Sequence, residues 1–364
     1  MEQKKAYIIL ANGMVFEGFS FGAEGTSIGE VVFNTGMVGY EETLTDPSYY
    51  GQIITQTYPL VGNYGVNGED AESGKIWAFG YIVREVCDAP SNFRCGKTLD
   101  AFLKEQNIIG VYGVDTRRLT RIIRESGVMN GAVTTEYTEA TPALMEKIRA
   151  YAVTKAVETV TTKSNKLFNE NGKYNVALFD YGVKNNIIRN LVKRDCRVTL
   201  VPGTTTAQQL ESLQLDGIML SNGPGDPAEN VEIIENLRGI CALNKPIFGI
   251  CLGHQLMALA TGAKTEKLKY GHRGVNQPVT DYVHDRTYIT SQNHGYAVVG
   301  ESVNTSIADI SHVNANDGTV EGVRYKNMPC FTVQFHPEAC GGPKDTEYLF
   351  DEFVAMMKGG AHNA

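Results

Sequence analysis

A cysteine that follows an apolar run is the residue of this sequence best placed to do chemistry. The run over residues 246–250 leads directly into Cys251, which is flanked by Gly249 and Gly253, and a helical pattern follows at once. A Gly-x-nucleophile-x-Gly arrangement between a strand and a helix makes a sharp turn that exposes the nucleophile and directs helix N–H groups at its target. The helix N-terminus also favours the thiolate, the reactive form of cysteine. The alternative is a buried structural cysteine, the commoner role of a cysteine taken at random.

A base and an orienting acid follow another predicted strand. Residues 330–335 are predicted to form a strand that leads into His336-Pro337-Glu338. In an extended segment residues two apart point to the same side, so Glu338 is placed to hold the imidazole of His336 with one nitrogen facing Cys251. A histidine by itself is more often structural, but together with the cysteine turn this pattern favours catalysis. The chain order nucleophile, histidine, acid differs from that of α/β-hydrolases, which makes a simple esterase a poorer match.

A second turn offers groups that stabilise an anion. Asn222-Gly223-Pro224-Gly225-Asp226-Pro227 follows a predicted strand over 217–220. In open α/β sheets ligands bind at the carboxyl ends of the strands, and glycines allow backbone N–H groups to approach a substrate closely. With the N–H of Leu252, this turn is predicted to form an oxyanion hole. A plain tight turn is the alternative.

The elements after residue 174 alternate between apolar strands and amphipathic helices. We predict strands at 176–179, 197–201, 217–220 and 247–250, with helices at 185–193, 207–213, 231–243 and 252–261. This alternation predicts an α/β fold with a mostly parallel open sheet and helices on both faces. An antiparallel extension is predicted at 275–283, 287–291, 319–325 and 330–335, with Asn316-Asp317-Gly318 as a hairpin turn and a last helix at 347–358.

The first part of the chain has a different pattern, typical of an α+β domain. Strands are predicted at 6–10, 31–34, 52–58 and 76–83, and helices at 99–106 and 116–125 with Thr98 and Asp115 as N-caps. Four arginines (Arg117, Arg118, Arg121 and Arg124) occupy the polar face of the second helix, as a solvated face or as a docking surface for an acidic partner. We predict an N-terminal domain over 1–153, a polar linker over 154–174 and a second domain over 175–364.

The overall composition indicates a soluble globular protein. The chain has 364 residues, 42% of them hydrophobic and 20% charged, and its formal net charge of -8 argues against nucleic acid as the main ligand. Seven cysteines without a Cys-x-x-Cys pair fit a reducing compartment, and no run is long enough to span a membrane, so we expect a cytoplasmic protein. The seven histidines show no metal-ligand spacing, so no metal is expected. Residues 91–98 are one residue from a phosphate-binding loop, but a helix cap at Thr98 explains them better.

The motifs in combination resemble a known family. Residues 249–255, 222–227 and 336–338 resemble class I (triad) glutamine amidotransferases. Residues 33–42, 45–49, 58–65 and 115–117 resemble the small (glutaminase) subunit of glutamine-dependent carbamoyl-phosphate synthase. The likeness extends over essentially the whole chain.

This resemblance implies that Cys251 attacks the carboxamide of L-glutamine, that His336 transfers protons, and that Glu338 orients His336. The family's glutamine-binding positions fall on Ser48, Gly223, Gly225, Leu252, Gln255, Asn293, Gly295 and Tyr296. Two positions depart from the family pattern: Tyr296 stands where phenylalanine is common, and Cys340-Gly341 where Ser-Pro is usual.

The resemblance also implies a partner. It names the large synthetase subunit, which binds ATP with its metal ions and makes carbamoyl phosphate from bicarbonate for pyrimidine and arginine synthesis. No cofactor is expected on this chain. The alternatives are an amidotransferase subunit serving GMP or anthranilate synthesis, and a catalytically silent scaffold subunit. The first domain argues against the former, and the intact Cys251, His336 and Glu338 argue against the latter.

Overall fold

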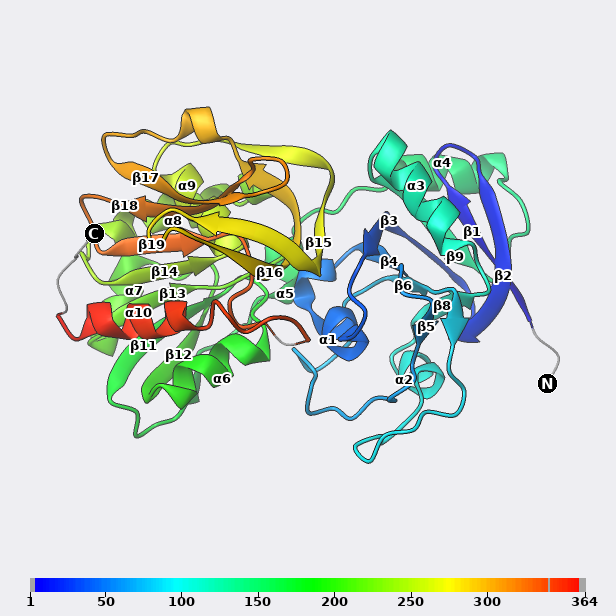
Figure 1. Cartoon of the computed structure of the whole chain (residues 1–364), viewed down its shortest axis with the longest axis horizontal. Helices are drawn as coiled ribbons and strands as arrows, with labels where there is room; N and C mark the ends of the chain where they lie inside the picture. The colour runs from blue at the N-terminus through cyan, green and yellow to red at the C-terminus, as the bar shows by residue number, and fades with distance from the viewer. Residues whose placement is uncertain (1–3, 340, 360–364) are drawn as a thin grey trace. The chain divides into compact units, whose positions relative to one another are not determined.

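The chain forms two compact units, residues 1–154 and 155–364 (Figure 1). The computed structural model describes residues 4–339 and 341–359. The boundary falls at the start of the segment predicted as a linker.

The first unit contains a closed β-barrel with the strand order β1-β2-β8-β6-β4-β3-β9. Pairing of β1 with β9 closes the barrel and leaves no open edge. The barrel strands are β1 (Lys5–Leu10), β2 (Val15–Gly22), β3 (Thr26–Asn34), β4 (Gln52–Gln56), β6 (Gly80–Ile82), β8 (Ile109–Tyr112) and β9 (Met129–Thr134), and β5 (Leu60–Val61) pairs separately with β7 (Glu85–Val86).

The helices of this unit are α1 (Tyr40–Thr45), η1 (Pro47–Tyr49), α2 (Leu99–Glu105), α3 (Thr116–Ser126) and α4 (Pro142–Ala150). Both predicted N-caps are confirmed. The side chain of Thr98 accepts a hydrogen bond from the Ala101 N–H, and that of Asp115 accepts one from the Arg118 N–H.

The second unit contains a 10-stranded sheet with the order β10-β12-β11-β13-β14-β19-β18-β16-β15-β17. Its strands are β10 (Lys166–Phe168), β11 (Tyr174–Asp180), β12 (Cys196–Pro202), β13 (Gly217–Leu220), β14 (Ile247–Ile250), β15 (Thr265–Asp281), β16 (Arg286–Val298), β17 (Ala308–Asn314), β18 (Val320–Tyr325) and β19 (Cys330–Val333). Within this order, the neighbouring strands β12, β11, β13, β14 and β19 pair in parallel. The strand pairings beyond β19 are antiparallel. The predicted sheet is thus confirmed.

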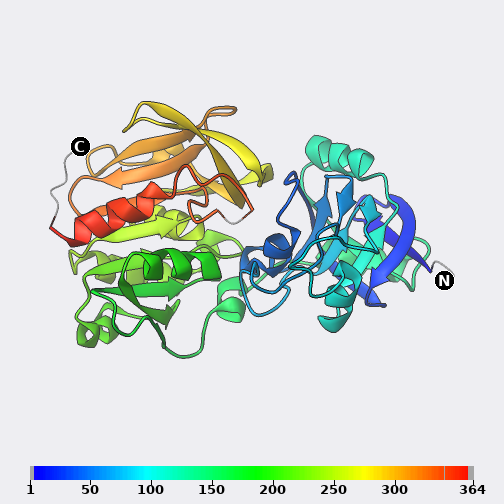
Figure 2. The same ribbon diagram turned by 60° about the horizontal axis from the view of Figure 1, so that its bottom comes forward.

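Helices cover both faces of the parallel strands, as the sequence predicts (Figures 1 and 2). Successive side chains of β11 point to opposite faces of the sheet. Val176 and Leu178 therefore pack in one core, and Ala177 and Phe179 pack in the other. The first core includes residues of α6 (Asn185–Lys193) and α10 (Tyr348–Met357); the second includes residues of α7 (Ala207–Leu210), α8 (Val231–Cys241) and α9 (Leu252–Ala260). Short helical turns lie at η2 (Glu211–Leu213), η3 (Pro227–Glu229) and η4 (Gly300–Ser302).

The segment predicted as a linker is structured instead. It contains α5 (Ala156–Val160) and β10, and β10 pairs antiparallel with β12 at the edge of the sheet. Ala156 and Val157 are buried, while Lys166 and Leu167 of β10 are exposed. An edge strand can expose most of its side chains and can therefore be polar. The polar composition of this stretch for that reason resembled the composition of a linker.

Strand β14 is held by an aromatic cluster. Phe248 is fully buried, and its ring stacks on Phe331 of β19 at a centroid distance of 4.4 Å. The ring of Phe350 of α10 makes a T-shaped contact with Phe248, at a centroid distance of 5.5 Å. Aromatic pairs of this kind contribute beyond the area they bury.

We expect Phe248→Ala to lower the free energy of unfolding by about 3–5 kcal/mol, because it leaves a cavity between β14, β19 and α10. Thermal unfolding of the full chain, followed by circular dichroism, measures this. Phe93→Ala is the control: Phe93 is 96% exposed, and its loss should change stability by about 0.5 kcal/mol or less. Equal melting temperatures for both variants would contradict the packing role.

Candidate active site

Cys251 lies at the carboxyl end of β14, in a strained backbone conformation. Its φ is 52° and its ψ is −102°, and α9 begins at the next residue. A non-glycine residue with positive φ is uncommon and is found where a turn places a side chain for function. The Cys251 N–H donates to the carbonyl of Val333 in β19 at 2.8 Å. The predicted strand–nucleophile–helix turn is therefore present.

The two flanking glycines are required by close packing. A Cβ on Gly249 would lie 2.8 Å from Cγ2 of Thr332, and one on Gly253 would lie 2.5 Å from the carbonyl oxygen of Leu220. The Gly253 N–H donates to the carbonyl of Ser221 at 3.0 Å. The turn is thus pressed against β13 on one side and β19 on the other, with no space for side chains.

The loop after β13 lies beside the first turn of α9. A Cβ on Gly223 would meet both the Tyr181 carbonyl and the side chain of Leu252, and Gly225 has a φ of +89°. The Asn222 side chain accepts a hydrogen bond from the Lys184 N–H at 3.2 Å. These contacts bring the loop next to the nucleophile turn, as the predicted oxyanion hole needs.

His336 and Glu338 form a buried pair. Their Nδ1 and Oε1 atoms are 2.7 Å apart, and the residues are 1% and 3% exposed. The His336 N–H donates to the Ser291 carbonyl of β16 at 2.9 Å. Its Nε2 is buried and has no hydrogen-bond partner within the described part of the chain. Glu338 therefore fixes one nitrogen of the imidazole and leaves the other available for proton transfer.

Strand pairing brings Cys251 and His336 to the same sheet edge. Parallel pairing of β14 with β19 aligns Ile250 with Val333, so the segments after both strands leave the sheet together. Both segments also contact β16, because the Cys251 Sγ lies 3.7 Å from the Asn293 carbonyl while His336 pairs with Ser291.

Lys184 joins this pair, although no sequence pattern singled it out. Its Nζ lies 3.3 Å from Oε1 of Glu338 and 3.2 Å from Nδ1 of His336. Lys184 directly precedes α6, in the loop that follows β11. The only signal in the sequence was its position after a predicted strand, at the carboxyl edge of the sheet. Many residues share that position, so it could not single out Lys184.

Opposing influences set the pKa of Glu338. Burial raises it, but the charges of His336 and Lys184 outweigh burial and lower this pKa to about 2. The carboxylate therefore stays ionised at neutral pH, although it is buried.

Several of the predicted glutamine-binding residues of the second unit lie close to the turn that carries Cys251. Gln255 of α9 is 3% exposed, and its Nε2 donates to the Tyr296 carbonyl at 2.7 Å and to Oε1 of Gln334 at 2.8 Å. The structure therefore brings β16, with Asn293, Gly295 and Tyr296, against the start of α9. Ser48 lies in the first unit, in η1, and its role stays a prediction. Cys340, one of the two departures from the family pattern, lies outside the described residues.

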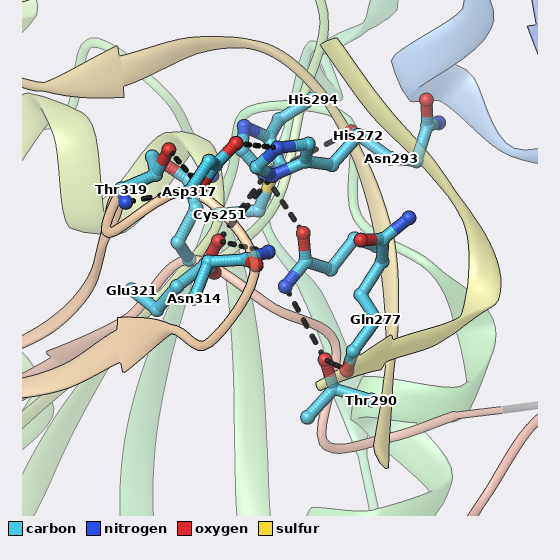
Figure 3. Close-up of polar contacts among 12 residues, drawn as sticks. Cys251, His272, Gln277, Thr290, Asn293, His294, Asn314, Asp317, Thr319 and Glu321 are labelled. Atoms are coloured by element: carbon cyan, nitrogen blue, oxygen red, sulfur yellow. Dashed lines mark hydrogen bonds and ion pairs between the residues drawn. The ribbon is translucent and has the colours of Figure 1, made fainter. Parts of the chain in front are cut away.

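One group within the described residues could hold a metal ion. His272, His294 and Glu321 are all buried, and each offers a ligand atom within 4.8 Å of the others (Figure 3). Histidine spacing in the sequence could not reveal this group, because its members come from β15, β16 and β18.

Comparison with known proteins identifies both units. A model of the carbamoyl-phosphate synthase small chain, CPSase domain, matches residues 8–133, and one of class-I glutamine amidotransferases matches residues 177–356. The carbamoyl phosphate synthase small chain of Clostridium perfringens is 51% identical over 350 residues, which cover 96% of this chain and 99% of that protein. The Listeria monocytogenes protein of the same name is 52% identical over 357 residues, covering 98% and 97%.

The chain belongs to the carbamoyl-phosphate synthase small chain family. With its amidotransferase domain, it has the role of the glutamine-hydrolysing subunit. The match of the first unit decides against the small chains of GMP or anthranilate synthesis. Within the described residues, no helix is both long and apolar enough to cross a bilayer.

We expect Glu338→Gln to lower the free energy of unfolding at pH 7 by about 3 kcal/mol, because the Lys184 side chain, only 13% exposed, loses its anionic partner. The folded pKa of Glu338 lies below its ordinary value of 4.5, so its contribution to stability is complete above about pH 4.5 and is lost as the pH falls toward 2. The difference between wild type and variant should shrink over that range. Denaturant unfolding at several pH values measures it.

Lys184→Met in the Glu338→Gln background is the matched control. It removes the cation that faced the lost carboxylate and should restore part of the lost stability. A difference between wild type and Glu338→Gln that stayed constant from pH 7 to pH 2.5 would show that the carboxylate charge is not the cause.

Proposed function

We propose that Cys251 is the nucleophile that hydrolyses L-glutamine, that His336 transfers the protons, and that Glu338 orients His336. The observation that supports this most directly is the position of the buried His336–Glu338 pair at the sheet edge that also carries Cys251. A nucleophile, a base and an orienting acid in this relation are the requirement for acyl transfer through a covalent intermediate.

The reaction proceeds in two halves. His336 accepts the thiol proton of Cys251 while the sulfur bonds to the side-chain carbonyl carbon of glutamine, and the C=O electron pair moves to the oxygen. The C–N bond then breaks as His336 protonates the leaving nitrogen, which gives ammonia and a γ-glutamyl thioester. In the second half, water attacks the thioester while His336 accepts its proton; the C–S bond breaks, glutamate leaves, and the thiol is restored.

The oxyanion of each tetrahedral intermediate is assigned to the backbone N–H of Leu252 and to the loop with Gly223 and Gly225. Leu252 is the first residue of α9, so the helix dipole adds to its N–H group. Each such donor is typically worth about 3 kcal/mol in the transition state. Gln255, Asn293, Gly295 and Tyr296 complete the glutamine site in this proposal.

The ammonia is proposed to pass directly to a large synthetase subunit. Ammonia released into water at neutral pH is mostly protonated and lost as a nucleophile. The large subunit would hold ATP and its metal ions and make carbamoyl phosphate from bicarbonate, for pyrimidine and arginine synthesis in the cytoplasm. This chain itself would need no cofactor.

Cys251→Ser tests the nucleophile. We expect its glutaminase rate to fall by about 10³-fold or more, because serine lacks a thiolate. Cys241→Ser is the control, because Cys241 lies at the end of α8, next to the Met257 sulfur and apart from the proposed machinery. Mass spectrometry of wild type quenched during turnover should show a γ-glutamyl adduct on Cys251. Equal glutamate release by wild type and Cys251→Ser would overturn the mechanism.

The partner is tested with glutamine labelled by ¹⁵N in its amide. Addition of the large subunit with ATP and bicarbonate should accelerate glutamate release and place ¹⁵N in carbamoyl phosphate, even with excess unlabelled ammonium in solution. If the label in carbamoyl phosphate equalled that in bulk ammonium, direct transfer would be wrong.

A further inference from the structure

A buried polar group lies beside the segment 293–296 of the proposed glutamine site, and the mechanism does not use it. Its members are His272 of β15, His294 of β16 and Glu321 of β18, which are 7%, 5% and 0% exposed (Figure 3). One ligand atom of each lies within 4.8 Å of the others. Nδ1 of His272 and Oε2 of Glu321 have no hydrogen-bond partner within the described residues. Buried polar atoms are rarely left without a partner, so this group calls for an explanation.

The outer partners of the two histidines determine which nitrogen of each ring carries the hydrogen. Nε2 of His272 lies 2.8 Å from a carboxylate oxygen of Asp317. Nδ1 of His294 lies 2.8 Å from the carbonyl oxygen of Tyr296. Both of these oxygens can only accept a hydrogen bond, so both nitrogens donate. The lone pairs of the other two nitrogens, Nδ1 of His272 and Nε2 of His294, therefore face Glu321.

Gln292 of β16 adds a fourth lone pair to this group. Thr290 donates its hydroxyl hydrogen to the carbonyl of Gln277 at 2.9 Å, and so it accepts from Nε2 of Gln292 at 3.3 Å (Figure 3). These contacts fix the orientation of the Gln292 amide, and its Oε1 faces Nε2 of His294 at 3.2 Å. An amide oxygen has no hydrogen to donate, and this nitrogen has none either. The two acceptors cannot form a hydrogen bond with each other.

The separations within the group match those between ligands of one metal ion. Oε1 of Glu321 is 3.5 Å from Nδ1 of His272 and 3.9 Å from Nε2 of His294, and the Asn314 amide lies 3.5 Å from the same oxygen. A hydrogen bond between a cation and a carboxylate is normally about 2.7–2.9 Å long. Two ligands about 2.1 Å from a tetrahedral Zn²⁺ lie roughly 3.4 Å apart. The distances of 3.5 and 3.9 Å from the histidine nitrogens are too long for such hydrogen bonds and close to the spacing around an ion.

The charges of the group also favour a divalent cation. Two carboxyl groups, of Glu321 and Asp317, lie here, and within the part of the chain that the structure describes their ion-pair partners are histidines, with no lysine or arginine among them. A buried carboxylate without a balancing charge is costly. Asp317 holds the outer nitrogen of His272, which is how a carboxylate commonly supports a histidine that binds a metal. An ion of charge +2 balances both carboxylates.

We propose that Nδ1 of His272, Nε2 of His294 and Oε1 of Glu321 bind one divalent transition-metal ion. The amide oxygen of Gln292 is the fourth ligand. Two imidazoles with a carboxylate and an amide oxygen suit Zn²⁺. The ion gives Nδ1 of His272 the partner that it lacks and balances the charge on Glu321. A metal here differs from the expectation drawn from histidine spacing.

The ion is structural rather than catalytic. All four ligands are protein atoms, as in structural zinc sites, whereas catalytic zinc sites keep one position for water or substrate. It joins β15, β16 and β18 and takes no part in glutamine hydrolysis. Because the ligand residues are buried, the ion enters as the chain folds, and its binding adds to the free energy of unfolding.

Zinc alone is the probe, and the full chain without a purification tag is the sample. Chain produced in medium with added zinc and purified without chelator should hold about one equivalent of zinc by elemental analysis. After unfolding in the presence of a chelator, refolding with zinc should give a melting temperature roughly 5 °C above that of chain refolded without metal. Cobalt in place of zinc should give the visible absorption bands of a tetrahedral site.

Three variants identify the ligands. Glu321→Gln removes the anionic ligand with little change of shape and should retain less than about 0.2 equivalent of zinc. Asp317→Asn keeps all four ligands but weakens the support of His272, and should lower the affinity for zinc about 10–100-fold in competition with a chromogenic chelator. His284→Gln is the matched control. His284 lies in the turn between β15 and β16 and contacts Asp281, outside the group, so one equivalent should remain.

Two results would overturn the metal site. One is a wild type with less than about 0.1 equivalent of any transition metal and the same melting temperature whether it refolds with or without zinc. The other is zinc that Glu321→Gln and Asp317→Asn bind as tightly as wild type, because the ion then lies elsewhere. If Glu321→Gln does not fold, Asp317→Asn and the cobalt spectrum of wild type decide. Metal content and stability are measured without glutamine, so they stay informative if the proposed function fails.

Discussion

The active site depends on one strand pairing, that of β14 with β19. Cys251 follows β14 and His336 follows β19, and the parallel register aligns Ile250 with Val333. The hydrogen bond from the Cys251 N–H to the Val333 carbonyl continues this pairing into the turn. Because parallel strands end at a common edge, the nucleophile and its base meet there although 84 positions separate them in the sequence. A shift of register by one residue would turn the side chains to the opposite face.

Close packing around this pairing explains the composition of the motif. β13 and β19 press against Gly253 and Gly249, so the turn has a strained cysteine between two residues without side chains. The Phe248–Phe331 stack in the core beneath holds the two strands. The free energy of that core permits the strain at Cys251, which would not persist in an isolated turn.

Burial imposes an electrostatic requirement on the same region. Glu338 is ionised although it is buried, because His336 and Lys184 lie close to it. A cation from another loop, Lys184, balances the charge of this carboxylate. The cost of desolvation thus determines which partners this carboxylate must have.

Local patterns determined much of this protein. The strand-to-helix turn at Cys251, the caps at Thr98 and Asp115, the alternation of strands and helices, and the spacing of His336 and Glu338 depend on neighbours in the chain, and the sequence predicted them. Strands β10 and β17, the closure of the barrel, Lys184 and the group of His272, His294 and Glu321 were missed. Each depends on contacts between residues far apart in the chain, and on burial that changes what a polar side chain needs. Only the tertiary structure decided those contacts, because pairing and packing bring together groups that no spacing in the sequence relates.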